Sequence, residues 1–126
     1  MGHVLVVDDD NLFLQVVCRA LQLDGIQAVP ARNGEEALNA IKRSRPDLIL
    51  LDLVMPGMDG LSLLRSLRLE KETADVPVII FSVNTTENVT EKARALGANA
   101  VLLKTRFSIA ELRKMVKGYI EGREAA

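Results

Sequence analysis

Four short, uninterrupted apolar runs constrain most strongly what this chain can fold into. They cover residues 4–7, 48–51, 78–81 and 100–103, and none of them alternates polar with apolar side chains. Strands of this kind are usually covered on both faces, as in a parallel sheet. A fifth run, at residues 26–29, ends at a proline, which favours an edge strand.

The stretches between these runs carry helical signals. Residues suited to cap the N-terminus of a helix stand at Asn33, Asp59, Asn84 and Ser108. Strand and helix therefore alternate along the chain, and right-handed crossovers between parallel strands give a doubly wound α/β sheet with helices on both faces. We expect a single domain over residues 1–121, followed by a frayed polar tail at 122–126.

The balance of charges and the single cysteine exclude several classes of protein. Lys and Arg total 16 and Asp and Glu total 17, so we expect no direct binding to nucleic acid, which usually needs a basic excess. The sequence shows no apolar run long enough to cross a membrane. We also expect no signal peptide, because the first apolar stretch ends in three aspartates by residue 10. Cys18 cannot form an internal disulfide, which fits a reducing cytoplasm.

Polar side chains suited to phosphate or metal follow four of the predicted strands. The first run is followed by Asp8, Asp9 and Asp10, the run at 48–51 by Asp52, the run at 78–81 by Ser82 and the run at 100–103 by Lys104. In an open α/β sheet, binding sites form outside the carboxyl ends of the strands. We therefore expect these side chains to meet at one edge of the sheet.

The residue types at this edge are those of phosphoryl transfer to an aspartate. Clustered carboxylates repel one another and recruit a cation, and Mg²⁺ prefers hard oxygen ligands. Asp9 and Asp52, with Asp8 behind them, fit such a site. A metal there would hold a phosphoryl group in line with a carboxylate nucleophile. Lys104 and Ser82 could then bind two phosphoryl oxygens.

Each of these residues has a simpler explanation when it is taken alone. The aspartates at 8–10 could cap a helix, where carboxylates suit the helix dipole. Asp52 could belong to the turn at residues 55–57, and Ser82 and Lys104 could be ordinary surface residues. Only their combination at one edge favours a phosphoryl-transfer site.

The chain resembles the receiver domains of two-component response regulators in four strings: LVVDDD, LILLDLVMPGMDGL, PVIIFS and GANAVLLK. These strings follow one another in the family's order and spacing over essentially the whole chain, and the segment DLVMPGMDG is highly specific. The resemblance implies a flavodoxin-like fold with strand order 2-1-3-4-5.

The resemblance also implies a role for each residue of the edge. Asp52 would accept a phosphoryl group from a histidine of a sensor kinase or phosphotransfer protein. Asp9 and Asp52 would bind Mg²⁺ together with the backbone carbonyl of Val54, and Asp8 would assist through a water. The hydroxyl of Ser82 would move toward the phosphate, and the resulting change would bias the domain between two states.

In this family Lys104 would form an ion pair with the phosphate, and a partner would read the change on the face of the fourth helix, fifth strand and fifth helix. The implied partners are a downstream protein or output domain, with a homodimer through the same face as another possibility. Such domains are not normally described as enzymes, so we expect no activity beyond slow autodephosphorylation.

Three positions depart from the usual pattern of the family. Thr105 replaces the proline that usually follows the lysine, which leaves a trans bond or a strained cis bond as alternatives. Val101 replaces the usual aromatic switch residue, and Val83 replaces a small residue. These changes motivate a different interpretation, a pseudo-receiver that binds partners without phosphorylation. An aspartyl-phosphate phosphatase is a third possibility, but Val54 stands where such enzymes place a second acid.

The start of the first predicted helix carries three consecutive apolar side chains that cannot all face the core. We expect Phe13 to be buried together with Val16, Val17 and Ala20, which leaves Leu12 or Leu14 exposed beside the site. In the family this helix meets the phosphodonor, so we expect an apolar docking patch there.

Overall fold

The structure is a computed structural model that describes residues 2–53, 59–83 and 86–125. Its strands are β1 (His3–Val7), β2 (Gln27–Ala31), β3 (Leu48–Leu51), β4 (Val78–Ser82) and β5 (Ala100–Leu103). Its helices are α1 (Asn11–Leu23), α2 (Gly34–Arg43), α3 (Gly60–Leu69), α4 (Glu87–Ala95) and α5 (Ile109–Ala125), with a short 3₁₀ helix, η1 (Lys104–Arg106), between β5 and α5.

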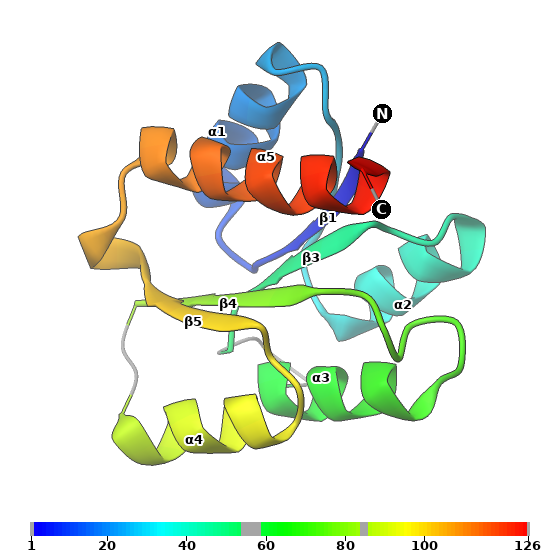
Figure 1. The fold of residues 1–126 in the computed structure, drawn as a ribbon. Helices are drawn as coiled ribbons and strands as arrows, with labels where there is room; N and C mark the ends of the chain where they lie inside the picture. Colours follow the sequence, from blue (N-terminus) through cyan, green and yellow to red (C-terminus); the bar gives the residue numbers. More distant parts are fainter. Residues whose placement is uncertain (1, 54–58, 84–85, 126) are drawn as a thin grey trace.

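The strands form one parallel sheet in the order β2-β1-β3-β4-β5. Helices α1 and α5 cover one face of this sheet, and α2, α3 and α4 cover the other (Figure 1). The doubly wound fold and the strand order predicted from the sequence are therefore confirmed.

Both faces of the sheet are apolar, which explains the uninterrupted runs in the sequence. In β3, Leu48 and Leu50 pack in the core beneath α1 and α5, whereas Ile49 and Leu51 pack in the core beneath α2, α3 and α4. All four side chains are buried. The central strand therefore contributes to both cores at once. Burying one such side chain stabilises the fold by about 1.5–3 kcal/mol.

The edge strand β2 is longer than predicted. The strand was expected to end at Val29, but it continues through Pro30 to Ala31, and Pro30 pairs with Val6 of β1. A proline lacks the N–H that a strand donates to a neighbour, which a strand at the edge of a sheet can tolerate. The prediction of an edge strand is confirmed, and its predicted end is wrong.

Most of the predicted helix caps are present in the structure. Asn33, Asp59 and Ser108 each accept a hydrogen bond from a backbone N–H three residues later, at 2.8, 2.8 and 3.1 Å. Asn84 lies outside the described residues, and the cap of α4 is Thr86. The backbone of α5 stays helical to Ala125, so most of the tail expected to fray is helical.

Candidate functional site

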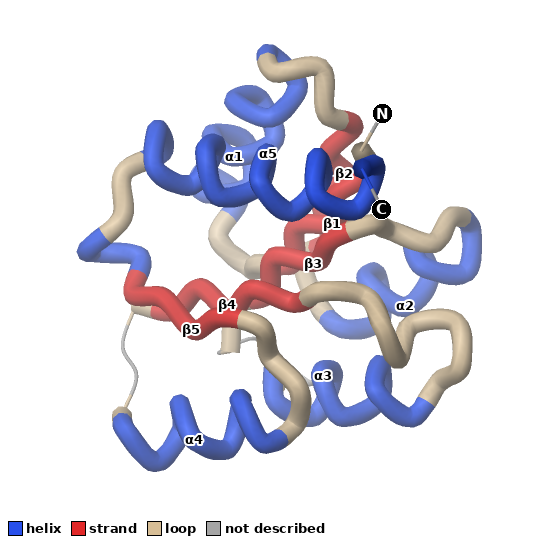
Figure 2. The backbone as a smooth tube through the Cα atoms, viewed as in Figure 1, coloured by secondary structure: helices blue, strands red, loops and turns tan. Residues whose placement is uncertain are grey.

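The strands lie side by side in one sheet (Figure 2), and because neighbouring strands are parallel their carboxyl ends lie at the same edge of it. Asp8 directly follows β1 and Asp52 directly follows β3, and only 1% and 6% of their surfaces are exposed. The Asp8 N–H donates to the carbonyl of Ala31, and the Asp52 N–H donates to the carbonyl of Val7, both at 2.9 Å. The hydrogen-bond ladder of the sheet thus extends one residue further and fixes the backbone of both aspartates.

Three carboxylates gather at this edge. One oxygen from each of Asp8, Asp9 and Asp52 lies within 4.8 Å of the other two, and Asp9 is the exposed member of the group. Three hard oxygen ligands at this spacing, two of them buried, fit a divalent cation such as Mg²⁺. The sequence prediction that these aspartates come together is met by the geometry of the structure.

Asp10 does not join this group. Its side chain caps α1 by accepting hydrogen bonds from the N–H groups of Leu12 at 3.0 Å and Phe13 at 3.3 Å. Its own N–H donates to the Asp8 carboxylate at 2.9 Å. The helix-capping explanation is therefore right for Asp10, and this cap ties the acidic loop to the first turn of α1.

Lys104 is the cation of the site. Its ammonium nitrogen forms an ion pair with the Asp8 carboxylate and lies 4.0 Å from Oδ2 of Asp52. It also lies 4.3 Å from the centre of the Phe13 ring. No cis peptide bond occurs in the described residues, so the bond between Lys104 and Thr105 is trans.

Ser82 completes the set of predicted residues that the structure describes. It ends β4, it is buried, and its Cα pairs with Leu103, the residue before Lys104. The hydroxyl therefore lies at the end of β4, and the ammonium belongs to the residue that follows the neighbouring strand β5. Val54, the predicted carbonyl ligand, lies outside the described residues.

Gly60 is a residue of this site that the sequence reasoning missed. Its N–H donates to the carbonyl of Leu53 at 2.8 Å, so the start of α3 folds back against the chain that leaves β3. A Cβ at this position would meet the carbonyl oxygen of Asp52 and would lie 2.6 Å from the Cα of Leu53. Only glycine allows this close approach, and the Asp-Gly pair at 59–60 was its signal in the sequence.

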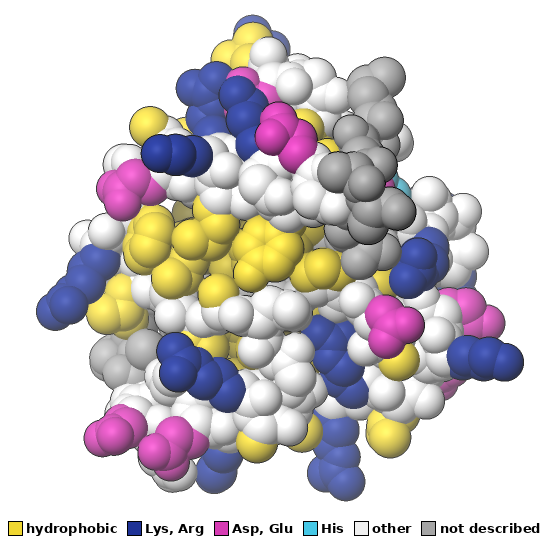
Figure 3. Space-filling model, viewed as in Figure 1, with side chains coloured by type: hydrophobic (Ala, Val, Ile, Leu, Met, Phe, Trp, Pro, Cys, Tyr) yellow, Lys and Arg dark blue, Asp and Glu magenta, His cyan; other side chains and the backbone are white. Residues whose placement is uncertain are grey.

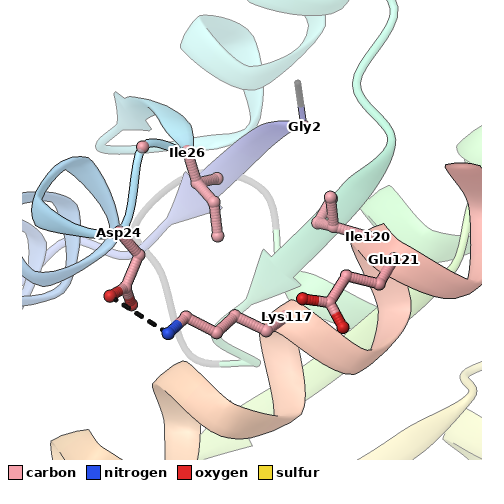
Figure 4. A pocket seen from close by; sticks show the side chains of 7 residues that line it. Gly2, Asp24, Ile26, Lys117, Ile120 and Glu121 are labelled. Atoms are coloured by element: carbon pink, nitrogen blue, oxygen red, sulfur yellow. Dashed lines mark ion pairs between the residues drawn. The ribbon is translucent and has the colours of Figure 1, made fainter.

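A cavity of about 160 Å³ lies at the opposite end of the sheet, between the turn after α1 and helix α5 (Figure 4). Asp24 at its wall accepts hydrogen bonds from Nε and a terminal nitrogen of Arg113, at 2.9 and 2.7 Å, and pairs with Lys117 at 3.3 Å. The hydrogen bond from Arg113 is the main reason why the pKa of Asp24 is lowered to about 2. This cluster joins α1 to α5 and takes no part in the acidic site.

The sequence also matches known proteins along most of its length. A model of the family described as "Response regulator receiver domain" matches residues 4–117. The chain belongs to this family. Receiver domains are signalling domains of two-component systems rather than classical enzymes.

Relatives of this receiver domain include proteins of two lengths. Transcriptional regulatory protein PrrA of Mycobacterium tuberculosis is 38% identical over 121 residues, which are 96% of this chain and 51% of PrrA. Sporulation initiation phosphotransferase F of Bacillus subtilis is 33% identical over 117 residues, or 93% of this chain and 92% of that protein. The chain therefore spans about half the length of PrrA and nearly all of the phosphotransferase.

The fold agrees with this family. The structure of the Francisella response regulator 1452 receiver domain matches with a TM-score of 0.86 and 34% identity, over 98% of this chain and 99% of that one. Within the described part of this receiver domain, none of the helices has the length and apolar character to span a membrane.

The first turns of α1 differ in part from the prediction. Leu12 is 69% exposed and Leu14 is buried, which resolves the two alternatives in favour of Leu12. Phe13, which was also expected to be buried, is half-buried, and Val16 is 42% exposed. Leu12 and Val16 are one helical turn apart, so they form an exposed apolar pair next to the acidic loop.

Proposed function

We propose that Asp52 of this receiver domain accepts a phosphoryl group from a phosphohistidine of a sensor histidine kinase or a histidine phosphotransfer protein. The observation that carries the proposal is the position of Asp52, buried between two further carboxylates and a lysine. A buried carboxylate that lies among other charged groups marks a candidate functional site.

In the proposed reaction, a carboxylate oxygen of Asp52 attacks the phosphorus atom and forms a new O–P bond. The N–P bond to the donor histidine breaks, and its electron pair stays on the imidazole nitrogen, which then takes up a proton. A carboxylate nucleophile carries no proton that a general base would have to remove. Positioning and charge compensation therefore supply most of the catalysis.

Lys104 and Ser82 are the residues of this chain that would offset negative charge on the phosphoryl oxygens. The ammonium, 4.0 Å from Asp52, is within reach of an oxygen on a phosphoryl group attached there. The Ser82 hydroxyl, on the neighbouring strand, would donate a hydrogen bond to a second oxygen. Both interactions would be stronger with the phosphorylated aspartate than without it, as a switch between two states requires.

The carboxylates of Asp8, Asp9 and Asp52 would hold Mg²⁺, with the carbonyl of Val54 as a further ligand. The metal would neutralise charge on the incoming phosphoryl group. Asp9 is the exposed ligand, so it lies on the side from which a cation and a phosphodonor would enter.

The exposed pair formed by Leu12 and Val16 is proposed as the docking surface for the phosphodonor. It lies on the helix whose N-terminal cap is tied to the acidic loop. An apolar contact here would bring the donor histidine to the carboxyl edge of the sheet.

The face formed by α4, β5 and α5 is proposed to pass the signal on. Hydrophobic side chains gather between α5 and β5 (Figure 3). All four residues of β5 are half-buried, and β5 is an edge strand of the described sheet. We propose that a downstream protein, an output domain or a second copy of the chain binds this face. We also propose that the domain, over residues 1–121, acts in the cytoplasm.

The proposal is tested by incubating the protein with Mg²⁺ and a small phosphodonor such as acetyl phosphate, followed by mass spectrometry. We expect one added phosphoryl group per chain, located on Asp52 and absent from Asp52→Asn. Asp59→Asn is the matched control, because asparagine caps a helix as well as aspartate does.

Two other results would each support a different function. An unmodified Asp52 that also fails to bind beryllofluoride would leave only the pseudo-receiver, which Val101 and Thr105 favour. Release of many phosphates per chain would instead indicate an aspartyl-phosphate phosphatase.

A further inference from the structure

The three phenylalanines of this chain form a row that ends at Lys104, the lysine of the acidic site. Phe13 and Phe81 have ring centres 6.4 Å apart, and Phe81 and Phe107 have ring centres 6.0 Å apart in an edge-to-face arrangement. The row ends at Lys104, whose ammonium lies 4.3 Å from the centre of the Phe13 ring. The four residues come from α1, β4 and the segment after β5.

Lysine is a flexible side chain that has to be held if its charge is to sit at one place. In this site only 12% of the Lys104 side chain is exposed, so most of this side chain is removed from water. The Asp8 carboxylate holds it on one side, and the face of the Phe13 ring lies beside it. The attraction between a cation and an aromatic face strengthens when the cation has lost its water.

The Phe13 ring is itself well fixed. Phe81, against which it packs, is buried and directly precedes Ser82 on β4. The N–H of Phe13 donates to the carboxylate of Asp10, which caps α1 and is tied to Asp8. The ring is therefore anchored both to the core and to the acidic loop.

We propose that Phe13 is a positioning residue for Lys104, and that its ring holds the ammonium where it can receive a phosphoryl oxygen on Asp52. This inference rests on the proposed function of Asp52. A leucine at position 13 would fill similar space in the core, but it would offer no aromatic face, so Lys104 would pair with Asp8 alone. A tyrosine would keep the face.

The test measures the rate at which Asp52 is phosphorylated by acetyl phosphate and Mg²⁺. A small donor is used because it does not need the docking surface at Leu12. We expect Phe13→Leu to slow the reaction by roughly threefold to tenfold and Phe13→Tyr to restore it. Phe107→Leu is the matched control: it removes an aromatic ring from the same row, and we expect its rate to stay within about twofold of the native protein.

A spectroscopic measurement separates positioning from packing. Protons next to the Lys104 ammonium lie over an aromatic face, so their NMR signals should be shifted upfield, and Lys104→Arg identifies them. We expect Phe13→Leu to abolish this shift, while Phe13→Tyr and Phe107→Leu retain it.

The proposal is overturned if Phe13→Leu reacts at the native rate, if Phe107→Leu is slowed as much, or if Phe13→Tyr fails to restore the rate. The native protein is measured in the same assay. If native Asp52 is not phosphorylated at all, the proposed function fails, while the NMR shift still reports whether the ring holds the lysine.

Discussion

The ammonium nitrogen of Lys104 lies 4.0 Å from Oδ2 of Asp52, while it forms an ion pair with Asp8. Among the residues that the structure describes, Lys104 thus stands beside a cluster of three carboxylates, because Asp9 belongs to the same group. Three carboxylates carry more negative charge than one ammonium offsets, and a bound divalent cation would offset the remainder. We therefore expect the stability of the domain to depend on whether a divalent cation occupies the proposed site.

Removal of one of these charges should stabilise the protein when no divalent cation is present. We expect Asp52→Asn to raise the free energy of unfolding in EDTA by about 1–2 kcal/mol, because it relieves repulsion between carboxylates. Added Mg²⁺ should stabilise the native protein progressively and Asp52→Asn much less. Urea denaturation with and without Mg²⁺ measures both effects. A variant less stable than the native protein in EDTA would contradict the argument.

The close approach of Gly60 to Asp52 predicts a second effect on the site. In Gly60→Ala the new Cβ would meet backbone atoms of Asp52 and Leu53, so the chain after β3 would have to shift. We expect a loss of about 1–3 kcal/mol in stability together with slower phosphorylation of Asp52.

Gly118→Ala is the control for this substitution. A Cβ on Gly118, inside α5, would meet nothing within 4 Å apart from its chain neighbours and the backbone of its own helix, so alanine should stabilise the helix by up to about 1 kcal/mol. Thermal unfolding of the two variants should therefore change in opposite directions. Equal and small effects would mean that Gly60 does not fix the chain after β3.

A charged side chain at Leu12, the more exposed residue of the pair with Val16, tests the proposed docking surface. Leu12 is 69% exposed, so Leu12→Lys should leave stability nearly unchanged. We expect it to slow phosphotransfer from a phosphorylated histidine phosphotransfer protein by roughly tenfold, with no change in the rate from acetyl phosphate.

The matched control for Leu12 is another exposed leucine on a different helix. Leu69 is 77% exposed at the C-terminal end of α3, and Leu69→Lys should leave both rates unchanged. If the Leu12 variant reacts with the protein donor as fast as the Leu69 variant does, α1 does not form the docking surface.

The sequence predicts this fold well because the sheet is covered on both faces. Residues 48–51 are apolar without interruption, and the structure buries every one of them. The site follows from the same rule, since Asp8, Asp52 and Lys104 each come directly after a strand of one parallel sheet. Parallel strands bring their carboxyl ends together whatever their separation along the chain.

The features that were missed depend on contacts between distant parts of the chain. Helical periodicity placed Val16 in the core, but it does not define the edge of the buried stripe, and Val16 lies just beyond it. The approach of Phe13 to Lys104 joins the first turn of α1 to the residue that follows β5, and no local pattern encodes it. The same holds for the pairing of Asp24 with Arg113.

The pairing of Asp24 with Arg113 predicts how stability depends on pH. The hydrogen bond from Arg113 lowers the pKa of Asp24 from 3.8 to about 2 in the folded protein. Between these values the unfolded chain binds more protons at this position than the folded protein does. The stabilisation is therefore fully present above about pH 4 and is lost as the pH falls toward 2.

We expect Asp24→Asn to lower the midpoint of thermal unfolding at pH 7, and the difference from the native protein to shrink below about pH 4. Arg113→Gln should show the same trend, and the double variant should lose little more than either single variant, because both remove one interaction. High salt should also reduce the difference, since 40% of the Arg113 side chain is exposed. Unfolding curves from pH 7 down to pH 3 measure the effect. A difference that stays constant over this range would show that Asp24 does not join α1 to α5 through its charge.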